Sequence, residues 1–197
     1  MWSSIAPGIG LHYATYGFNP VKEGLMDIRD VLIDGTTQMN EWTDKALEGL
    51  DAGKVNWLPP GNTLSIGFNA WHIFRTQDNI TNFVFKRQTP IWIEKGYVDR
   101  LGLPKIEQGT GMDMETARGL SINDVDLLRE YGQVVGKDCV EFLKTVDIGS
   151  LNEIQMIKPL GEMPRWRVFR QVVMTHGFMH LGEINSLKGQ QGLGFFL

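Results

Sequence analysis

Cysteine is nearly absent from this chain of 197 residues, and long apolar runs are missing altogether. The single cysteine, Cys139, excludes an intrachain disulfide and a cysteine-based zinc cage. No apolar run approaches the roughly 20 residues that span a bilayer, so we expect no membrane segment. The N-terminus lacks the basic start and apolar run of a signal peptide. A cytoplasmic protein fits these absences best.

An excess of basic residues is missing as well. The chain has 19 Lys and Arg against 23 Asp and Glu, which gives a net charge of −4. A general nucleic-acid-binding protein would carry a basic face, so we expect no nucleic-acid partner. The apolar fraction of 42% and the charged fraction of 21% are ordinary for a globular protein. A chain of this length can bury a sizeable core as one domain.

Apolar residues recur at helical spacing in four long stretches, 21–50, 63–85, 121–146 and 164–187. Convincing alternating strands are lacking between them. The pattern predicts an all-α fold, an antiparallel four-helix bundle, in which metal sites lie between facing helices.

The first 20 residues differ from this pattern because glycine and proline interrupt them repeatedly. We therefore divide the chain into an N-terminal arm, residues 1–20, and a bundle domain, residues 21–197.

Several residues have the chemistry of helix starts. Thr63 or Ser65 is suited to cap the second helix, and Ser121, with Asp124 three residues later, resembles a capping box at the start of the third. Pro164 suits the first turn of the fourth helix.

Two connections separate the last three helices. Residues 86–120 are long for a connection, contain a glycine-rich stretch, and are expected to include a short helix. Connections of this length in compact domains are often lids or interfaces. Exposed aromatic residues within 87–120 would form an interface, so we expect a homodimer. Residues 147–163 are expected to pair briefly as strands.

His176 and His180 carry the strongest chemical signal of the fourth helix. They are four residues apart and therefore share one helix face, on which Glu183 also lies. Apolar neighbours indicate that this face points inward, where polar groups need partners. One metal ion would satisfy both imidazoles. Three roles are open to Glu183: an acceptor that orients a ligand, a metal ligand, or a proton acceptor.

The same pair has a structural interpretation. A bare His-x-x-x-His is about as often a surface or hydrogen-bonded core pair as a metal site. Gly177 stands where a zincin protease requires its glutamate base, which excludes that class. Cys139 lies in the apolar series of the third helix, so we interpret it as a core thiol rather than a nucleophile.

His72 is the candidate third ligand, in the second predicted helix. Alone it is weak evidence, because a histidine on an apolar helix is more often satisfied by packing and a hydrogen bond. Arg75 would lie close to the ion, which is unfavourable unless it points at an anionic substrate or pairs with Asp78. Three imidazoles would leave open positions on the metal, as catalytic sites do.

Two segments resemble the DinB/YfiT-like superfamily, in its DinB-like branch. They are AWHIFRTQDNITNFVFKRQTPIW followed by YVDRLGLP, and THGFMHLGEINSLKGQQGLGF. The chain departs from the family pattern in its N-terminal arm, in lacking an acidic residue directly before Asp78, and in Lys188 where arginine is usual.

The resemblance implies an up-down-down-up four-helix bundle, often homodimeric. It implies a divalent metal, most often nickel or zinc, held by His72, His176 and His180. Characterised relatives include thiol-dependent S-transferases that use low-molecular-weight thiols such as bacillithiol or mycothiol.

We therefore expect a metal-dependent enzyme that transfers a small thiol to a small electrophilic substrate, with Arg75 orienting an anionic group. Two alternatives stay open: a metal-dependent hydrolase with Glu183 as base, and a non-catalytic bundle that binds a metal or ligand. Imidazole suits zinc, nickel, copper and iron alike, so the residues do not name the metal.

Overall fold

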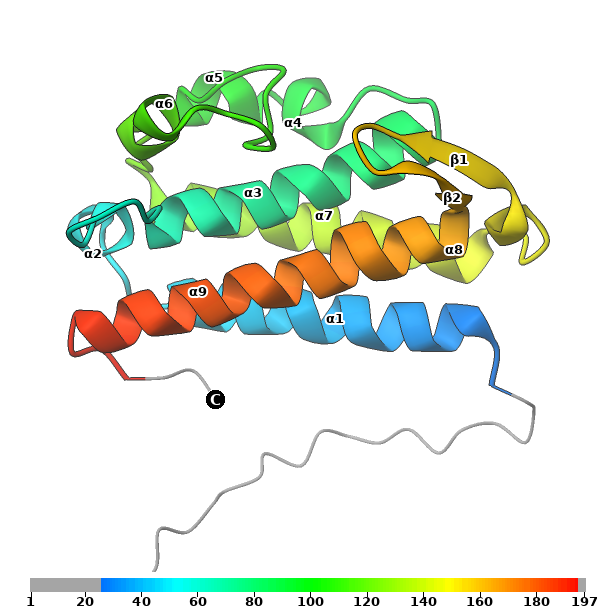
Figure 1. The fold of residues 1–197 in the computed structure, drawn as a ribbon, viewed down its shortest axis with the longest axis horizontal. Coiled ribbons are helices and arrows are strands. Elements are labelled where there is room, and N and C mark those ends of the chain that lie inside the picture. The colour runs from blue at the N-terminus through cyan, green and yellow to red at the C-terminus, as the bar shows by residue number, and fades with distance from the viewer. Residues whose placement is uncertain (1–25, 195–197) are drawn as a thin grey trace, which may run out of the picture.

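Four long helical segments pack side by side along their length (Figure 1). The computed structural model describes residues 26–194, so the predicted arm and the first residues of the first predicted helix lie outside the described part. The four segments are α1 (Ile28–Leu47); α3 (Ile66–Asp78) continued by the π-helix η1 (Asn79–Phe85); α7 (Val125–Thr145); and α8 (Arg165–Val168), the π-helix η3 (Phe169–Thr175) and α9 (His176–Gln190).

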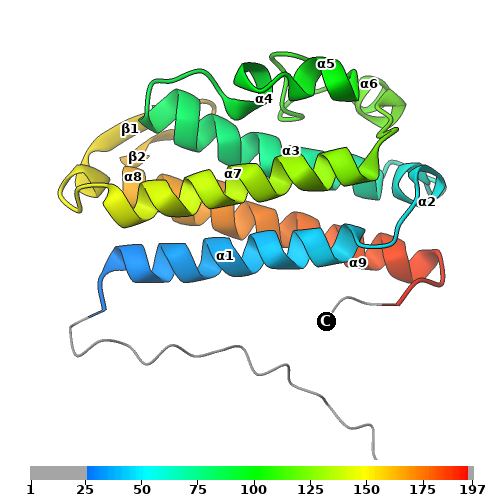
Figure 2. The same cartoon turned by 180° about the vertical axis from the view of Figure 1, so that it is seen from behind.

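The helix directions confirm the up-down-down-up bundle. α1 and α9 run one way, and α3 and α7 run the other way (Figures 1 and 2). α1 contacts α7 and α9, and α3 contacts the same two helices, so the four form a square in cross-section. Because α3 and α7 are parallel, the chain must return along the whole bundle between them.

This return explains the long connection after the second predicted helix. We call residues 86–124 the crossover; its short helices lie over α3 (Figure 1). They are α4 (Ile91–Glu94), α5 (Tyr97–Leu101) and α6 (Met114–Gly119). The expectation of exposed aromatic residues here is wrong, because the side chains of Trp92 and Tyr97 are only 0% and 2% exposed and pack into the core. The homodimer stays a prediction, without that support.

Asp78 attaches the crossover to the bundle. Its carboxylate is fully buried at the end of α3 and accepts hydrogen bonds from the backbone N–H groups of Ile91 (3.0 Å) and Trp92 (2.9 Å). The Tyr131 hydroxyl on α7 donates to it at 2.8 Å. Arg75 is an ion-pair partner at 3.9 Å, so the predicted pair exists, but the carboxylate has several closer partners.

The helix starts follow the predicted chemistry in part. Ser65 caps α3, and its hydroxyl accepts the N–H of Phe68 at 3.1 Å. The Ser121 start is wrong, because Asp124 caps α7 and accepts the N–H of Leu127 at 2.8 Å. The physical reason is tertiary: Ile122 is buried, and its N–H donates to the side chain of Asn56 at 2.8 Å instead of entering a helix.

The remaining elements are short. Two antiparallel strands confirm the expected strand pairing between the third and fourth long helices. A one-turn helix in the segment after α1 was not predicted. These elements are α2 (Ala52–Asn56), the 3-10 turn η2 (Ser150–Asn152), β1 (Ile154–Ile157) and β2 (Gly161–Pro164).

The side chain of Cys139 is 0% exposed, so the prediction of a core thiol is confirmed. Among the described helices, none combines the length and the apolarity needed to cross a bilayer.

Candidate metal centre

Three histidines from two facing helices converge at one point. His72 comes from α3, and His176 and His180 come from successive turns of α9. The Nε2 atom of His176 lies 3.2 Å from that of His72 and 3.0 Å from that of His180. The structure therefore brings together the three residues that the sequence proposed as ligands.

These separations suit one shared metal ion. Two nitrogens at about 2.0–2.1 Å from an ion are about 3 Å apart at a right angle and about 3.3 Å apart at the tetrahedral angle. In the described part of the chain, these three are the only group of histidine, cysteine or carboxylate side chains that converge closely enough to hold an ion.

Hydrogen bonds on the far side of two rings orient their lone pairs toward this point. The Nδ1–H group of His72 donates to the backbone carbonyl of Gln108. The Nδ1–H group of His180 points at the carboxylate of Glu183 (2.8 Å) and the side-chain oxygen of Asn69 (2.9 Å). Both rings then present an unprotonated Nε2 to His176. Lone pairs that face one another repel, and a cation between them removes the repulsion.

Burial favours the neutral form of two of the imidazoles. It lowers the pKa of His72 from 6.5 to about 4, since the ring lies in the interior and 5% of the residue is exposed. Burial also lowers the pKa of His176, with a further contribution from His180. At neutral pH these rings are unprotonated, which is the form that binds metals.

Glu183 does not reach the converging Nε2 atoms. Its carboxylate accepts the hydrogen bond on the opposite edge of the His180 ring, and this bond lowers the pKa of Glu183. Of the three roles open to Glu183, this contact matches the orienting acceptor. The candidate site therefore offers three imidazoles and no carboxylate from Glu183.

The helix that bears two ligands changes its winding just before them. η3 ends at Thr175, and the hydroxyl of Thr175 donates to the carbonyl of Arg170 at 2.9 Å, five residues back. A π-helical turn inserts one residue and rotates everything after it relative to what precedes; such turns are frequent at functional sites. Gly177, which excluded a zincin, faces α1, where an added Cβ would collide with the sulfur of Met39.

Arg75 lies one turn from His72, and its guanidinium contacts the crossover. Its side chain is 2% exposed, and its guanidinium lies over the ring of Trp92 at 5.1 Å. It contacts the crossover and Asp78 in the interior. The sequence placed it beside the ion; the structure places it between α3 and the crossover.

A hollow of about 300 Å³ adjoins the centre on the Glu183 side. It has no basic side chain, and Glu183 is its single acidic one. Its lining comes from the segment before α3, from α3, from α6 and from α9: Asn62, Thr63, Leu64, Asn69, Met114, Glu183, Ser186, Leu187 and Gln190.

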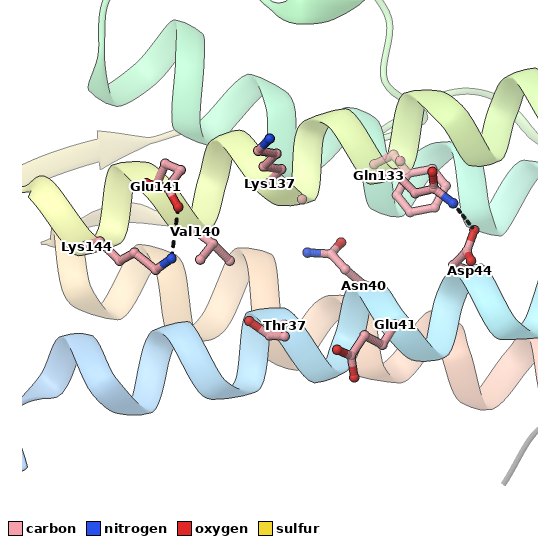
Figure 3. A pocket seen from close by; sticks show the side chains of 12 residues that line it. Thr37, Asn40, Glu41, Asp44, Gln133, Lys137, Val140, Glu141 and Lys144 are labelled. Atoms are coloured by element: carbon pink, nitrogen blue, oxygen red, sulfur yellow. Dashed lines mark hydrogen bonds and ion pairs between the residues drawn. The ribbon is translucent and has the colours of Figure 1, made fainter. Parts of the chain in front are cut away.

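A larger hollow of about 370 Å³ lies elsewhere, between α1 and α7 (Figure 3). Asn40 points from α1 toward α7, and the Gln133 amide donates to Asp44 across the gap at 3.1 Å. None of the three histidines lines it. The histidines do not line the smaller hollow either, but its lining includes Asn69 and Glu183, which both contact the ring of His180.

Two residues of the centre were not predicted. Asn69 shared a helix face with His72 in the sequence, and the amide orientation that makes it an acceptor is set by its donation to the Ser65 carbonyl at 3.1 Å. Gln108 contributes only its backbone, so its side chain gave no signal. Both act on the ring edges that face away from the centre.

A helical bundle with a buried candidate tri-histidine site defines the class of this protein. The chain belongs to the DinB superfamily, which it matches over residues 36–184. Its fold is similar to that of a conserved protein from Enterococcus faecalis, with a TM-score of 0.73 at 16% identity, covering 83% of this chain and 96% of the other. No curated protein matches the chain.

Proposed function

We propose that this protein binds a divalent metal ion through His72, His176 and His180. With this ion it acts as a thiol-dependent S-transferase on a small electrophilic substrate. The observation that carries the proposal is the convergence of three Nε2 atoms: that of His176 lies 3.2 Å from that of His72 and 3.0 Å from that of His180. Glu183 contacts the opposite edge of the His180 ring. Nickel and zinc both suit this donor set.

The arrangement favours an enzyme over a storage or sensing bundle. A site that only stores a metal is usually closed by four protein ligands, whereas three ligands leave a position for a reactant. When bound, the ion would lower the pKa of a thiol or a water in that position.

The thiol must come from outside the protein. Cys139 is the single cysteine, it is fully buried in α7, and burial raises its pKa to about 11. It is therefore neither accessible nor ionised at neutral pH. A low-molecular-weight thiol is the co-substrate that this chain would need.

The hollow beside Glu183 is the proposed place for the polar end of a reactant. Its amide, hydroxyl and carboxylate groups offer hydrogen bonds, and Leu64, Met114 and Leu187 offer apolar contact. With a carboxylate and no basic residue in the lining, it suits a neutral or cationic group better than an anionic one.

Elemental analysis of protein purified without a histidine tag tests the metal. We expect about one divalent ion per chain in the wild type and a large loss in His176→Ala. An alanine variant that keeps its full metal content would contradict the proposal.

The reaction is tested by incubating metal-loaded protein with electrophiles, with and without a small thiol. Product formation that requires the thiol supports the transferase. Turnover that is the same without thiol would instead identify the hydrolase, with Glu183 as its base.

A further inference from the structure

One stretch of the crossover lies directly on the first metal ligand. We call residues 105–112, between α5 and α6, the strap. Its Gln108 carbonyl accepts the Nδ1–H group of His72. Its Gly109 is packed so closely that an added Cβ would lie 2.7 Å from the Nδ1 atom of His72 and 3.0 Å from the Phe68 ring. The strap thus contacts the His72 ring through its backbone.

Arg75 holds the strap at the two preceding residues. Its Nη2 atom donates to the carbonyls of Ile106 and Glu107, each at 3.5 Å. Its other nitrogens make no hydrogen bond, so the strap receives every hydrogen bond that this buried guanidinium donates. The indole N–H of Trp92 donates to the carbonyl of Pro104 at 3.0 Å and fixes the residue just before the strap.

These contacts form a consecutive series. The carbonyls of residues 104, 106, 107 and 108 are bound in turn by Trp92, Arg75, Arg75 and His72. Arg75 and His72 are three residues apart on α3, so they present adjacent positions of one helix face to the strap. The position of the Gln108 carbonyl therefore depends on the anchor at Arg75.

We propose that Arg75 is a positioning residue for the metal centre: through the strap it fixes the tautomer and the ring angle of His72. This inference rests on the proposed metal-binding function and replaces the expectation that Arg75 orients a substrate. A carbonyl on Nδ1 holds the proton there and leaves Nε2 free for the ion. Loss of such an outer partner typically lowers metal affinity about 10–100-fold.

The strap offers a matched pair of glycines for the test. Gly109 and Gly111 both have a positive φ, +102° and +75°, so alanine strains the backbone at each. Only at Gly109 would the new Cβ meet His72, because nothing lies within 4 Å of a Cβ at Gly111. A difference between the two variants therefore reports contact with the ligand rather than strain in the loop.

The first measurement is Co²⁺ binding, followed by visible absorbance, with Zn²⁺ competition for affinity. We expect Gly109→Ala and Arg75→Met to lose about 10-fold or more, Arg75→Lys to recover part of the loss, and Gly111→Ala to stay within about threefold of the wild type. Equal losses in the two glycine variants, or full affinity in Arg75→Met, would overturn the inference.

The second measurement uses metal-free protein, so it separates this inference from the proposed function. Long-range ¹H–¹⁵N spectra distinguish the two histidine tautomers. We expect His72 to carry its proton on Nδ1 in the wild type and Gly111→Ala, and a mixture of tautomers in Gly109→Ala and Arg75→Met. A wild type without bound metal would defeat the proposed function, whereas an unchanged tautomer in both Gly109→Ala and Arg75→Met would defeat the role of the strap.

Discussion

The two helices that bear the candidate ligands differ in how far the protein covers them. All residues of α3 are buried, whereas α9 buries five, and Met179 beside the ligands is 65% exposed. The crossover lies on α3 and encloses it on the side away from the bundle (Figure 1). The candidate centre therefore has one wall fixed by packing, which carries His72, and one open wall that is partly exposed to solvent, which carries His176 and His180.

The largest effect is expected when the contacts that attach the crossover to α3 are removed. Asp78→Ala should lower the free energy of unfolding by about 3–5 kcal/mol, because it leaves buried Arg75 without its carboxylate and two backbone N–H groups without an acceptor. Urea denaturation measures this loss. Glu183→Ala, on the open wall, should lose less than about 1 kcal/mol. Equal losses would show that α3 is no more dependent on its cover than α9.

Removing one candidate ligand from each wall should lower the metal affinity equally but the free energy of unfolding unequally. His72→Ala and His180→Ala should each weaken metal binding more than about 100-fold, beyond the effect of losing an outer partner. In metal-free protein, His72→Ala should also lower the free energy of unfolding by about 1–3 kcal/mol, because its ring is buried, and His180→Ala should cost less. Calorimetry and a Zn²⁺ titration of both variants check this. Equal destabilisation of the two metal-free proteins would contradict the contrast.

The orienting contact on the open wall should have a smaller effect. Glu183→Ala should weaken metal binding about 10–100-fold through loss of the bond to His180, and Glu183→Gln less, since it keeps an acceptor. Ser186→Ala lines the same hollow and serves as the control, with unchanged affinity expected. Unaltered affinity together with lost turnover in Glu183→Ala would identify a proton acceptor instead.

The smallest expected effect is a pH dependence of the free energy of unfolding, which comes from the buried thiol of Cys139 in α7. Burial raises the pKa of Cys139 from 9.0 to about 11, so above pH 9 the unfolded thiol ionises while the folded one keeps its proton. Stability is thus present below pH 9 and lost as the pH rises to 11, by about 1.4 kcal/mol at pH 10. The difference between wild type and Cys139→Ala in unfolding free energy at pH 8 and pH 10 measures it. A parallel pH dependence in both proteins would refute the burial argument.

Local patterns predicted what depends on neighbours in sequence. The helical period located the four long helices to within several residues, because an amphipathic face requires apolar side chains every three or four positions. The His176 and His180 pair followed from the same geometry, and the family resemblance added His72. Helix starts were less certain: Ser121 and Asp124 have the same capping chemistry, and only the bond from Ile122 to Asn56 decides between them.

The crossover contains features that local sequence patterns could not predict. Its aromatic residues were expected to be exposed, because nothing in their spacing reveals that Trp92 and Tyr97 pack onto α7 through Tyr131. The π-helical turns before the His176 and His180 pair and after α3 also have no signature in the apolar period. Gln108 acts through a backbone carbonyl, which every residue type possesses.

The sequence by itself determined the kinds of groups available: four amphipathic helices, three candidate imidazole ligands and one buried thiol. The helices, the His176 and His180 pair and the thiol follow from spacing and composition, which are local, and the family resemblance supports His72 as the third ligand. Tertiary structure decided how the groups are used. It set the Nε2 separations, turned Glu183 to the outer edge of His180, and placed Arg75 under the strap. The contact of His72 with His176 and that of Arg75 with the strap join residues tens of positions apart. The second exists only because the parallel helices force the chain to cross over α3.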